Sequence, residues 1–194
     1  MARRGGTWVQ RWRVPLGFAC AAVFIVLARP DRRSLAVGGV VALVGLAIRA
    51  WASGHIRKNA QLAVSGPYAH TRNPLYLGSF ILGIGFTVAA SSGLMLFLVL
   101  GGLFAALFLG IYWPVMRVEA STLAEMFGGE YKAYAEAVPL LFPRPTPYRP
   151  GGPAAAAAPV KFDPSLYMRY REYRAALGLL VAWCVLWLKA VLAF

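Results

Sequence analysis

The chain has 194 residues, of which 59% are hydrophobic and only 14% are charged, and its mean hydropathy is +0.60. A soluble domain of this size rarely carries so much apolar surface, so the composition favours a polytopic membrane protein in a lipid bilayer. The formal net charge is +13. Basic residues beside membrane helices explain this charge, and no nucleic-acid partner is expected.

Five stretches have the composition of membrane helices. They are predicted at residues 15–28, 34–53, 75–90, 94–113 and 175–194. Short links at 29–33 and 90–93 predict two tight antiparallel hairpins. Pro114 is expected to end the fourth helix, because proline lacks the amide hydrogen that a helix interior needs. The expected fold class is all-α, a polytopic bundle of about five transmembrane helices.

Residues 115–138 are predicted to form an amphipathic helix after the fourth span. Apolar side chains recur there at three- and four-residue spacing, namely Met116, Ala120, Leu123, Phe127, Tyr131 and Tyr134. The Gly128-Gly129 pair should bend this helix, and Pro139 should end it.

Composition divides the chain into a core at 1–142, a proline- and alanine-rich linker at 143–163 and a C-terminal unit at 164–194. The prolines of the linker favour an extended or disordered chain. Asp163 and Pro164 suit the N-cap and first position of a helix. Tyrosines and arginines after Pro164 indicate an interfacial anchor for the last span, with lipid-headgroup binding as the weaker alternative.

Lysines and arginines gather in the N-terminal arm, in the loop before residue 75 and in the segment after residue 113. This bias predicts a cytoplasmic N terminus and an integral protein of the cytoplasmic membrane. Cys20 and Cys184 both lie in apolar runs, so we expect small buried side chains rather than a disulfide. No metal-spaced His/Cys set, P-loop or Gly-x-Gly-x-x-Gly occurs, and no metal site is expected.

The loop before the third span concentrates polar and turn-forming residues. Tyr68 and Tyr76 flank Arg72-Asn73-Pro74, and the following helix begins at the membrane surface. A helix N terminus presents unpaired N–H groups that can hold a carboxylate or ribose oxygen. The simpler interpretation is a proline-rich loop with interfacial tyrosine and arginine anchors.

Glu119 lies on the apolar face of the amphipathic helix, one turn from Met116 and Leu123. A carboxylate there is costly unless it is paired or solvated. One interpretation is a ligand-facing carboxylate that recognises a cation or hydroxyl groups. The other is a structural ion pair with Arg49, Arg72 or Arg117.

Two motifs together resemble a known family. Gly-Pro-Tyr-x-x-x-Arg-Asn-Pro-x-Tyr-x-Gly at 66–78 and Glu-x-x-x-Leu-x-x-x-Phe-Gly-x-Glu-Tyr-x-x-Tyr at 119–134 are similar to the isoprenylcysteine carboxyl methyltransferase and phospholipid methyltransferase superfamily. The resemblance implies S-adenosylmethionine-dependent methyl transfer by in-line displacement, with a cytoplasmic cofactor pocket formed by loops and the amphipathic helix. The acceptor would be a lipophilic or membrane-associated carboxylate, thiol or amine entering from the bilayer.

Carried over by motif, the resemblance also implies particular site residues. The cofactor contacts would be Lys58, Gln61, Leu62, Ala63, Tyr68, Asn73, Pro74, Leu75, Tyr76 and Glu119, and the catalytic residues Arg72, Arg117 and Glu119. The family often has histidine in place of Asn73 and a second glutamate in place of Ala120, so two titratable groups are absent here. The alternatives are a sterol-reductase-like NADPH-dependent membrane reductase and a non-catalytic membrane scaffold or lipid-binding protein.

Overall fold

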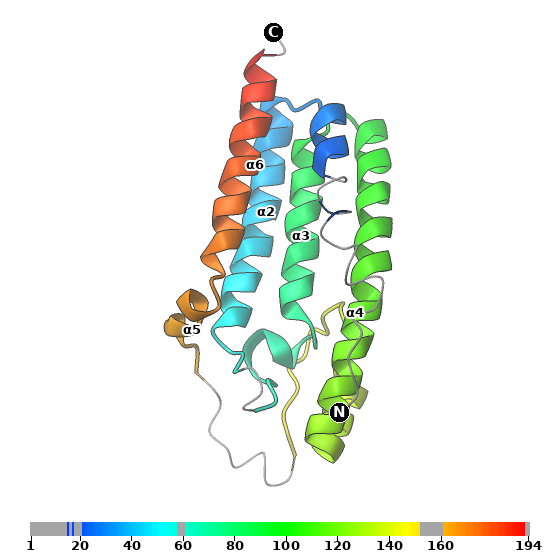
Figure 1. The fold of residues 1–194 in the computed structure, drawn as a ribbon, viewed down its shortest axis with the longest axis vertical. Coiled ribbons are helices and arrows are strands. Elements are labelled where there is room, and N and C mark those ends of the chain that lie inside the picture. Colours follow the sequence, from blue (N-terminus) through cyan, green and yellow to red (C-terminus); the bar gives the residue numbers. More distant parts are fainter. Residues whose placement is uncertain (1–14, 16, 18–20, 58–60, 152–160, 193–194) are drawn as a thin grey trace.

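The computed structural model describes residues 15, 17, 21–57, 61–151 and 161–192 (Figure 1). Over these residues the chain is helical and has no strand, which confirms the all-α class. The long helices α2 (Arg32–Ser53), α3 (Pro74–Ala89), α4 (Leu94–Ala137) and α6 (Tyr173–Leu192) run side by side. The 3₁₀ turn η1 (Gly66–Ala69) and the short helix α5 (Pro164–Arg169) lie at one end of this bundle.

Helices α2 and α3 make the most extensive contact between described elements because small residues line both surfaces. A Cβ atom added to Gly45 of α2 would lie 2.5 Å from the backbone nitrogen of Leu82. One added to Gly78 of α3 would lie 2.7 Å from the carbonyl oxygen of Gly45. The close approach of the two backbones fixes the start of α3 against the end of α2.

Helix α4 continues through Pro114, so the expectation that this proline ends the fourth helix is wrong. The predicted span 94–113 and the predicted amphipathic helix join without a break at Pro114, and α4 covers 44 residues with non-helical backbone at Gly128. A proline inside a helix costs one backbone hydrogen bond, which neighbouring groups can compensate in a membrane helix. The predicted bend is present at Gly128, where φ is 52° and ψ is −122°, and the helix ends at Ala137, ahead of Pro139.

Three described helices, α2, α4 and α6, are long and apolar enough to cross a membrane. Helix α3 is apolar but has 16 residues, roughly 24 Å of helix against about 30 Å of hydrocarbon. Residues 21–27 of the first predicted span are helical, while most of its remainder lies outside the described residues. The chain therefore has the layout of a helical membrane protein, but five spans are not confirmed.

Residues 139–148, which we call the strap, run beside the loop before α3 and hold it by hydrogen bonds. Backbone hydrogen bonds join Arg72 N to Pro139 O at 3.0 Å, Arg144 N to His70 O at 2.9 Å and Tyr148 N to Ala69 O at 2.8 Å. Thr71 adds a side-chain bond to Leu141 O at 2.8 Å. These bonds satisfy the polar backbone of an irregular loop and hold it in one conformation.

Asp163 caps α5 as the sequence predicts. Its Oδ1 accepts a hydrogen bond from Ser165 N at 2.9 Å. Hydrogen bonding from the Ser165 side chain, and then from its backbone, holds the pKa of the Asp163 carboxyl below its usual value. Helix α6 follows after a turn in which Arg171 has φ 57°.

Candidate functional site

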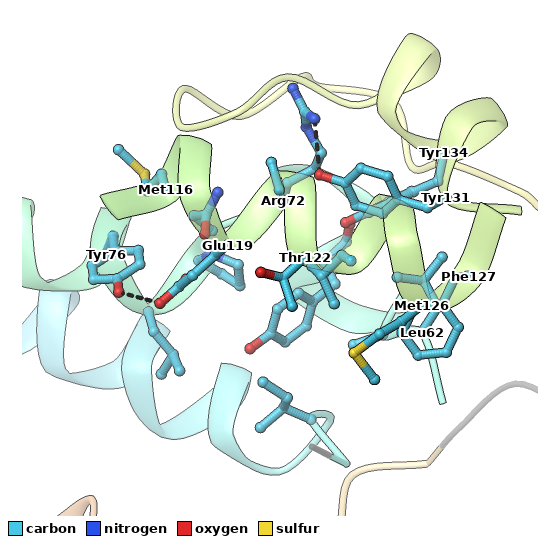
Figure 2. Close-up of a pocket in the computed structure, with 18 of the residues that line it drawn as sticks. Leu62, Arg72, Tyr76, Met116, Glu119, Thr122, Met126, Phe127, Tyr131 and Tyr134 are labelled. Atoms are coloured by element: carbon cyan, nitrogen blue, oxygen red, sulfur yellow. Dashed lines mark hydrogen bonds between the residues drawn. The ribbon is translucent and has the colours of Figure 1, made fainter. Parts of the chain in front are cut away.

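A cavity of about 620 Å³, here called the main pocket, lies between the loop before α3, the start of α3 and the second half of α4. Its two ends differ in chemistry (Figure 2). Tyr76 and Glu119 form a polar end, while Leu62, Met126 and Phe127 lie together at an apolar end. A pocket with these two ends suits an amphipathic organic molecule.

The Glu119 carboxylate is the acidic group of the polar end. It accepts a hydrogen bond from the Tyr76 hydroxyl at 2.9 Å, which joins the start of α3 to α4. Glu119 forms no ion pair with any described residue, so the alternative of a structural ion pair is not supported. A carboxylate with one donated hydrogen bond can accept more from a ligand cation or from hydroxyl groups.

The three arginines considered as partners of Glu119 are engaged elsewhere. Arg49 pairs with Glu172 at 2.6 Å and also donates to Ser79. The Arg72 Nη1 atom donates to the Tyr131 hydroxyl at 3.2 Å. Arg117 lies over the Trp113 ring, 5.8 Å from its centroid. Arg49 and Arg72 still line the main pocket, whereas Arg117 does not.

Tyrosine side chains shape the pocket floor. Tyr68 is buried, and the Tyr134 hydroxyl donates to its carbonyl oxygen at 2.7 Å. Burial raises the pKa of the Tyr68 hydroxyl, and the nearby carboxylates of Glu172 and Glu119 raise it further. Tyr68 is therefore a neutral hydrogen-bonding group across the physiological pH range rather than a base.

The structure brings nearly all the predicted site residues into one pocket. Its lining includes Gln61, Leu62, Ala63, Tyr68, Arg72, Asn73, Pro74, Leu75, Tyr76 and Glu119. Lys58 lies outside the described residues. Arg117 lines a different cavity, and its predicted catalytic role stays a prediction. The Asn73 amide donates to Leu140 O at 2.9 Å, so it also anchors the strap.

Some lining residues are not among those predicted. Thr122 and Met126 follow Glu119 at spacings of three and seven residues, so all three lie on one face of α4. That periodicity is visible in the sequence. Tyr131 and Tyr134 were expected on the apolar stripe of the same helix, but their contact with the pocket depends on the bend at Gly128.

The pocket is poorly suited to a divalent transition-metal ion. Among the residues described, no group of three or more His, Cys, Asp or Glu side chains is placed to hold one. The lining offers the single carboxylate of Glu119, with Arg49, Arg57 and Arg72 also present. Histidine and cysteine, the nitrogen and sulfur ligands that such ions prefer, are missing from the lining, and the arginines repel a cation.

The chain is similar to two proteins named for metal resistance. It is 36% identical over 150 residues to the cobalt-zinc-cadmium resistance protein CzcN of Cupriavidus metallidurans, covering 71% of this chain and 64% of that protein. It is 32% identical over 115 residues to the nickel-cobalt-cadmium resistance protein NccN of Alcaligenes xylosoxydans xylosoxydans, covering 58% of this chain and 50% of that protein. The matches thus span only part of each relative. No family model and no solved structure matches the chain.

These relatives contradict the function expected from the motifs. Their names point to metal resistance, not to methyl transfer onto a lipophilic acceptor. The motif resemblance, enzymatic activity and S-adenosylmethionine binding are not addressed by these names and stay predictions. The apolar helices fit an integral membrane protein, whereas a cytoplasmic N terminus is not shown.

Proposed function

We propose that this protein is an integral membrane component of resistance to divalent transition-metal ions such as cobalt, zinc and cadmium. The observation that carries the proposal is the 36% identity to CzcN over 71% of this chain. The three apolar helices agree with a role at the membrane that the ions must cross. Because the comparison covers 64% of CzcN, the proposal concerns the part of the two chains that matches.

Within that role, we propose that the main pocket binds an organic molecule and not the metal ion. The donor set argues for this choice, since one carboxylate accompanied by arginines makes a weak site for a divalent cation. The cavity volume of about 620 Å³ lies within the range of pockets that hold drug-sized ligands, about 300–1,000 Å³. The protein would then contribute to metal resistance by binding this organic molecule, without holding the metal ion in the main pocket.

S-adenosylmethionine is the first candidate for this molecule. Its cationic end and its ribose hydroxyls would find an acceptor in Glu119, and its adenine would find apolar surface at Leu62, Met126 and Phe127. The hydrogen bond from Tyr76 would hold the carboxylate in place for this contact. The candidate comes from the motif resemblance and from this division of the pocket into two ends.

A lipophilic partner molecule is proposed to reach the same pocket from the bilayer. Aromatic rings form a column from the polar end into the apolar part of α3 and α4. The ring centroids are 5.3 Å apart for Tyr76 and Tyr112, 4.6 Å for Tyr112 and Phe108, and 5.3 Å for Phe108 and Phe80. The half-buried rings of Tyr76, Phe80 and Tyr112 offer contacts to acyl or isoprenoid chains, and the buried ring of Phe108 packs between them.

The role in resistance is tested by complementation. A Cupriavidus metallidurans strain lacking CzcN would be grown on graded cobalt, zinc and cadmium, with and without this chain. We expect the wild-type chain to restore tolerance and Glu119→Gln to lose it, while Glu125→Gln, an exposed glutamate on the same helix, behaves as wild type. Normal membrane levels of the wild-type protein without any gain in tolerance would contradict the proposal.

The ligand is tested separately by calorimetry on purified protein in lipid nanodiscs. We expect S-adenosylmethionine to bind and Glu119→Gln to weaken it about tenfold or more, since a charged hydrogen bond is worth about 1.5–3 kcal/mol. Glu125→Gln again serves as the control. Absence of binding to folded wild-type protein would remove this candidate and leave the role in resistance untouched.

A further inference from the structure

A second cavity of about 390 Å³, here called the α4 cavity, lies on another face of α4. Its lining consists of Arg72, Trp113, Arg117, Ala120, Ser121 and Leu140. Trp113, Arg117 and Ser121 recur at four-residue spacing and form one stripe of the helix. Arg72 joins them from the loop before α3, so two guanidinium-bearing side chains from distant segments line one space. No acidic side chain is among the lining residues.

The positive charges of this cavity lack a described counter-charge. Neither Arg72 nor Arg117 forms an ion pair with a described acidic residue. The Arg72 Nε atom is buried and has no hydrogen-bond partner. A buried donor on a cation that lacks an acceptor is costly, and an anionic oxygen is the acceptor that stabilises it most.

The position of the cavity along α4 places it at the surface of a bilayer. Trp113 follows Leu94, the first residue of α4, by roughly 29 Å of helix rise, close to the roughly 30 Å thickness of the hydrocarbon core. Tryptophan at that depth is typical of the interface between hydrocarbon and water. Arg117 and Ser121 lie one and two turns farther along, at the level where lipid phosphates are found.

We propose that the α4 cavity binds the phosphate group of a membrane phospholipid, with Arg72 and Arg117 as its charged donors. Guanidinium groups match phosphate oxygens in charge and geometry, and the Ser121 hydroxyl supplies a further donor. The acyl chains would then lie along the exposed apolar surface of α4, which includes Leu98, Val99 and Leu103. This site shares Arg72 and Ala120 with the lining of the main pocket, whereas Trp113, Arg117 and Ser121 line the α4 cavity and not the main pocket. Its assignment does not depend on the proposed role in resistance.

The test is native mass spectrometry of the detergent-purified protein titrated with dioleoylphosphatidylglycerol. Dioleoylglycerol, which has the same chains but no phosphate, is the lipid control. We expect tight retention of the phosphate-bearing lipid and little retention of dioleoylglycerol. Arg117→Gln should weaken the phospholipid about tenfold, and Arg117→Lys, which keeps the charge but loses the planar donor pair, by a smaller factor.

A matched control separates this site from general charge attraction. Arg149→Gln removes one charge from another exposed arginine, which lines neither cavity, and should change retention less than about twofold. Equal weakening by Arg149→Gln and Arg117→Gln, or unchanged binding in folded Arg117→Gln protein, would overturn the proposal. Full displacement of the lipid by millimolar inorganic phosphate would identify a soluble anion as the ligand and overturn the lipid assignment.

Discussion

At the scale of single residues, the polar groups of the main pocket are held by hydrogen bonds and an ion pair. Glu119 is held by Tyr76, and the carbonyl of Tyr68 is held by Tyr134. Arg49 reaches Glu172, a residue far along the chain that ties the C-terminal helices to the pocket wall. These contacts orient the polar groups before any ligand arrives, which lowers the entropy that binding must overcome.

The raised pKa of the Tyr68 hydroxyl predicts that the folded protein loses stability in alkaline solution. Its folded pKa lies above its ordinary value of 10.0, so the unfolded state releases its proton first as the pH rises. The contribution of Tyr68 is therefore fully present below about pH 10 and declines above it. We expect the apparent melting temperature in detergent to fall less steeply above about pH 10 in Tyr68→Phe than in wild type.

The control for this prediction is Tyr167→Phe, in α5. Its pH profile should match that of wild type. If Tyr68→Phe and Tyr167→Phe give the same alkaline slope, the Tyr68 hydroxyl is not the group responsible.

At the scale of elements, α4 decides the shape of the site. The first half of this helix is apolar enough for a membrane span, and its second half carries Glu119, Thr122 and Met126 into the pocket. The bend at Gly128 turns the last part of the helix so that Tyr131 and Tyr134 reach the loop residues Arg72 and Tyr68. One continuous helix thus connects the bilayer to the pocket.

The bend can be tested by comparing two neighbouring glycines. Added Cβ atoms on Gly128 and Gly129 would both meet open space, but only Gly128 has a positive φ. We expect Gly128→Ala to destabilise the protein by about 1–3 kcal/mol, because an L-residue is strained in that conformation. Gly129→Ala should be neutral or slightly stabilising. Chemical unfolding in mixed micelles measures both, and equal effects would mean that the bend does not require glycine.

At the scale of the whole molecule, the described structure has two chemically different ends. The links at 28–31 and 90–93 lie at one end, joined by the hydrogen bond from Arg29 N to Ala90 O at 2.8 Å. The loop before α3, the strap and α5 lie at the other, together with the main pocket (Figure 1). Under the proposed function, a ligand dissolved in water would enter the main pocket from this second end.

The orientation in the membrane follows from charge and is open to direct measurement. We expect the pocket end to face the cytoplasm, because lysine and arginine concentrate there. In a chain with Cys20 and Cys184 replaced by alanine, Asp31→Cys should react with an impermeant maleimide added outside intact cells. Glu130→Cys should react only after the membrane is opened. The reverse pattern would invert the predicted topology.

Periodicity and composition were sufficient for the all-helical class and for apolar helices that fit a membrane, whereas the predicted pocket residues came from the motif resemblance. These features depend on residues that are close together in the sequence. Long apolar runs fit a membrane, Asp163 caps the helix that it precedes, and Gly128 bends α4 where predicted. The spacing of Glu119, Thr122 and Met126 also carries a signal, since it places all three on one face of a helix.

Only the tertiary structure decided which partner each charged side chain has and which cavity it lines. The sequence allowed Glu119 to pair with Arg49, Arg72 or Arg117, yet Arg49 pairs with Glu172 and Arg117 turns to Trp113. It also placed Pro114 at a helix end, whereas packing in a membrane bundle lets α4 continue through it. The reason is physical: a side chain's partner depends on distances across the bundle, which backbone approaches such as that of Gly45 to Leu82 determine.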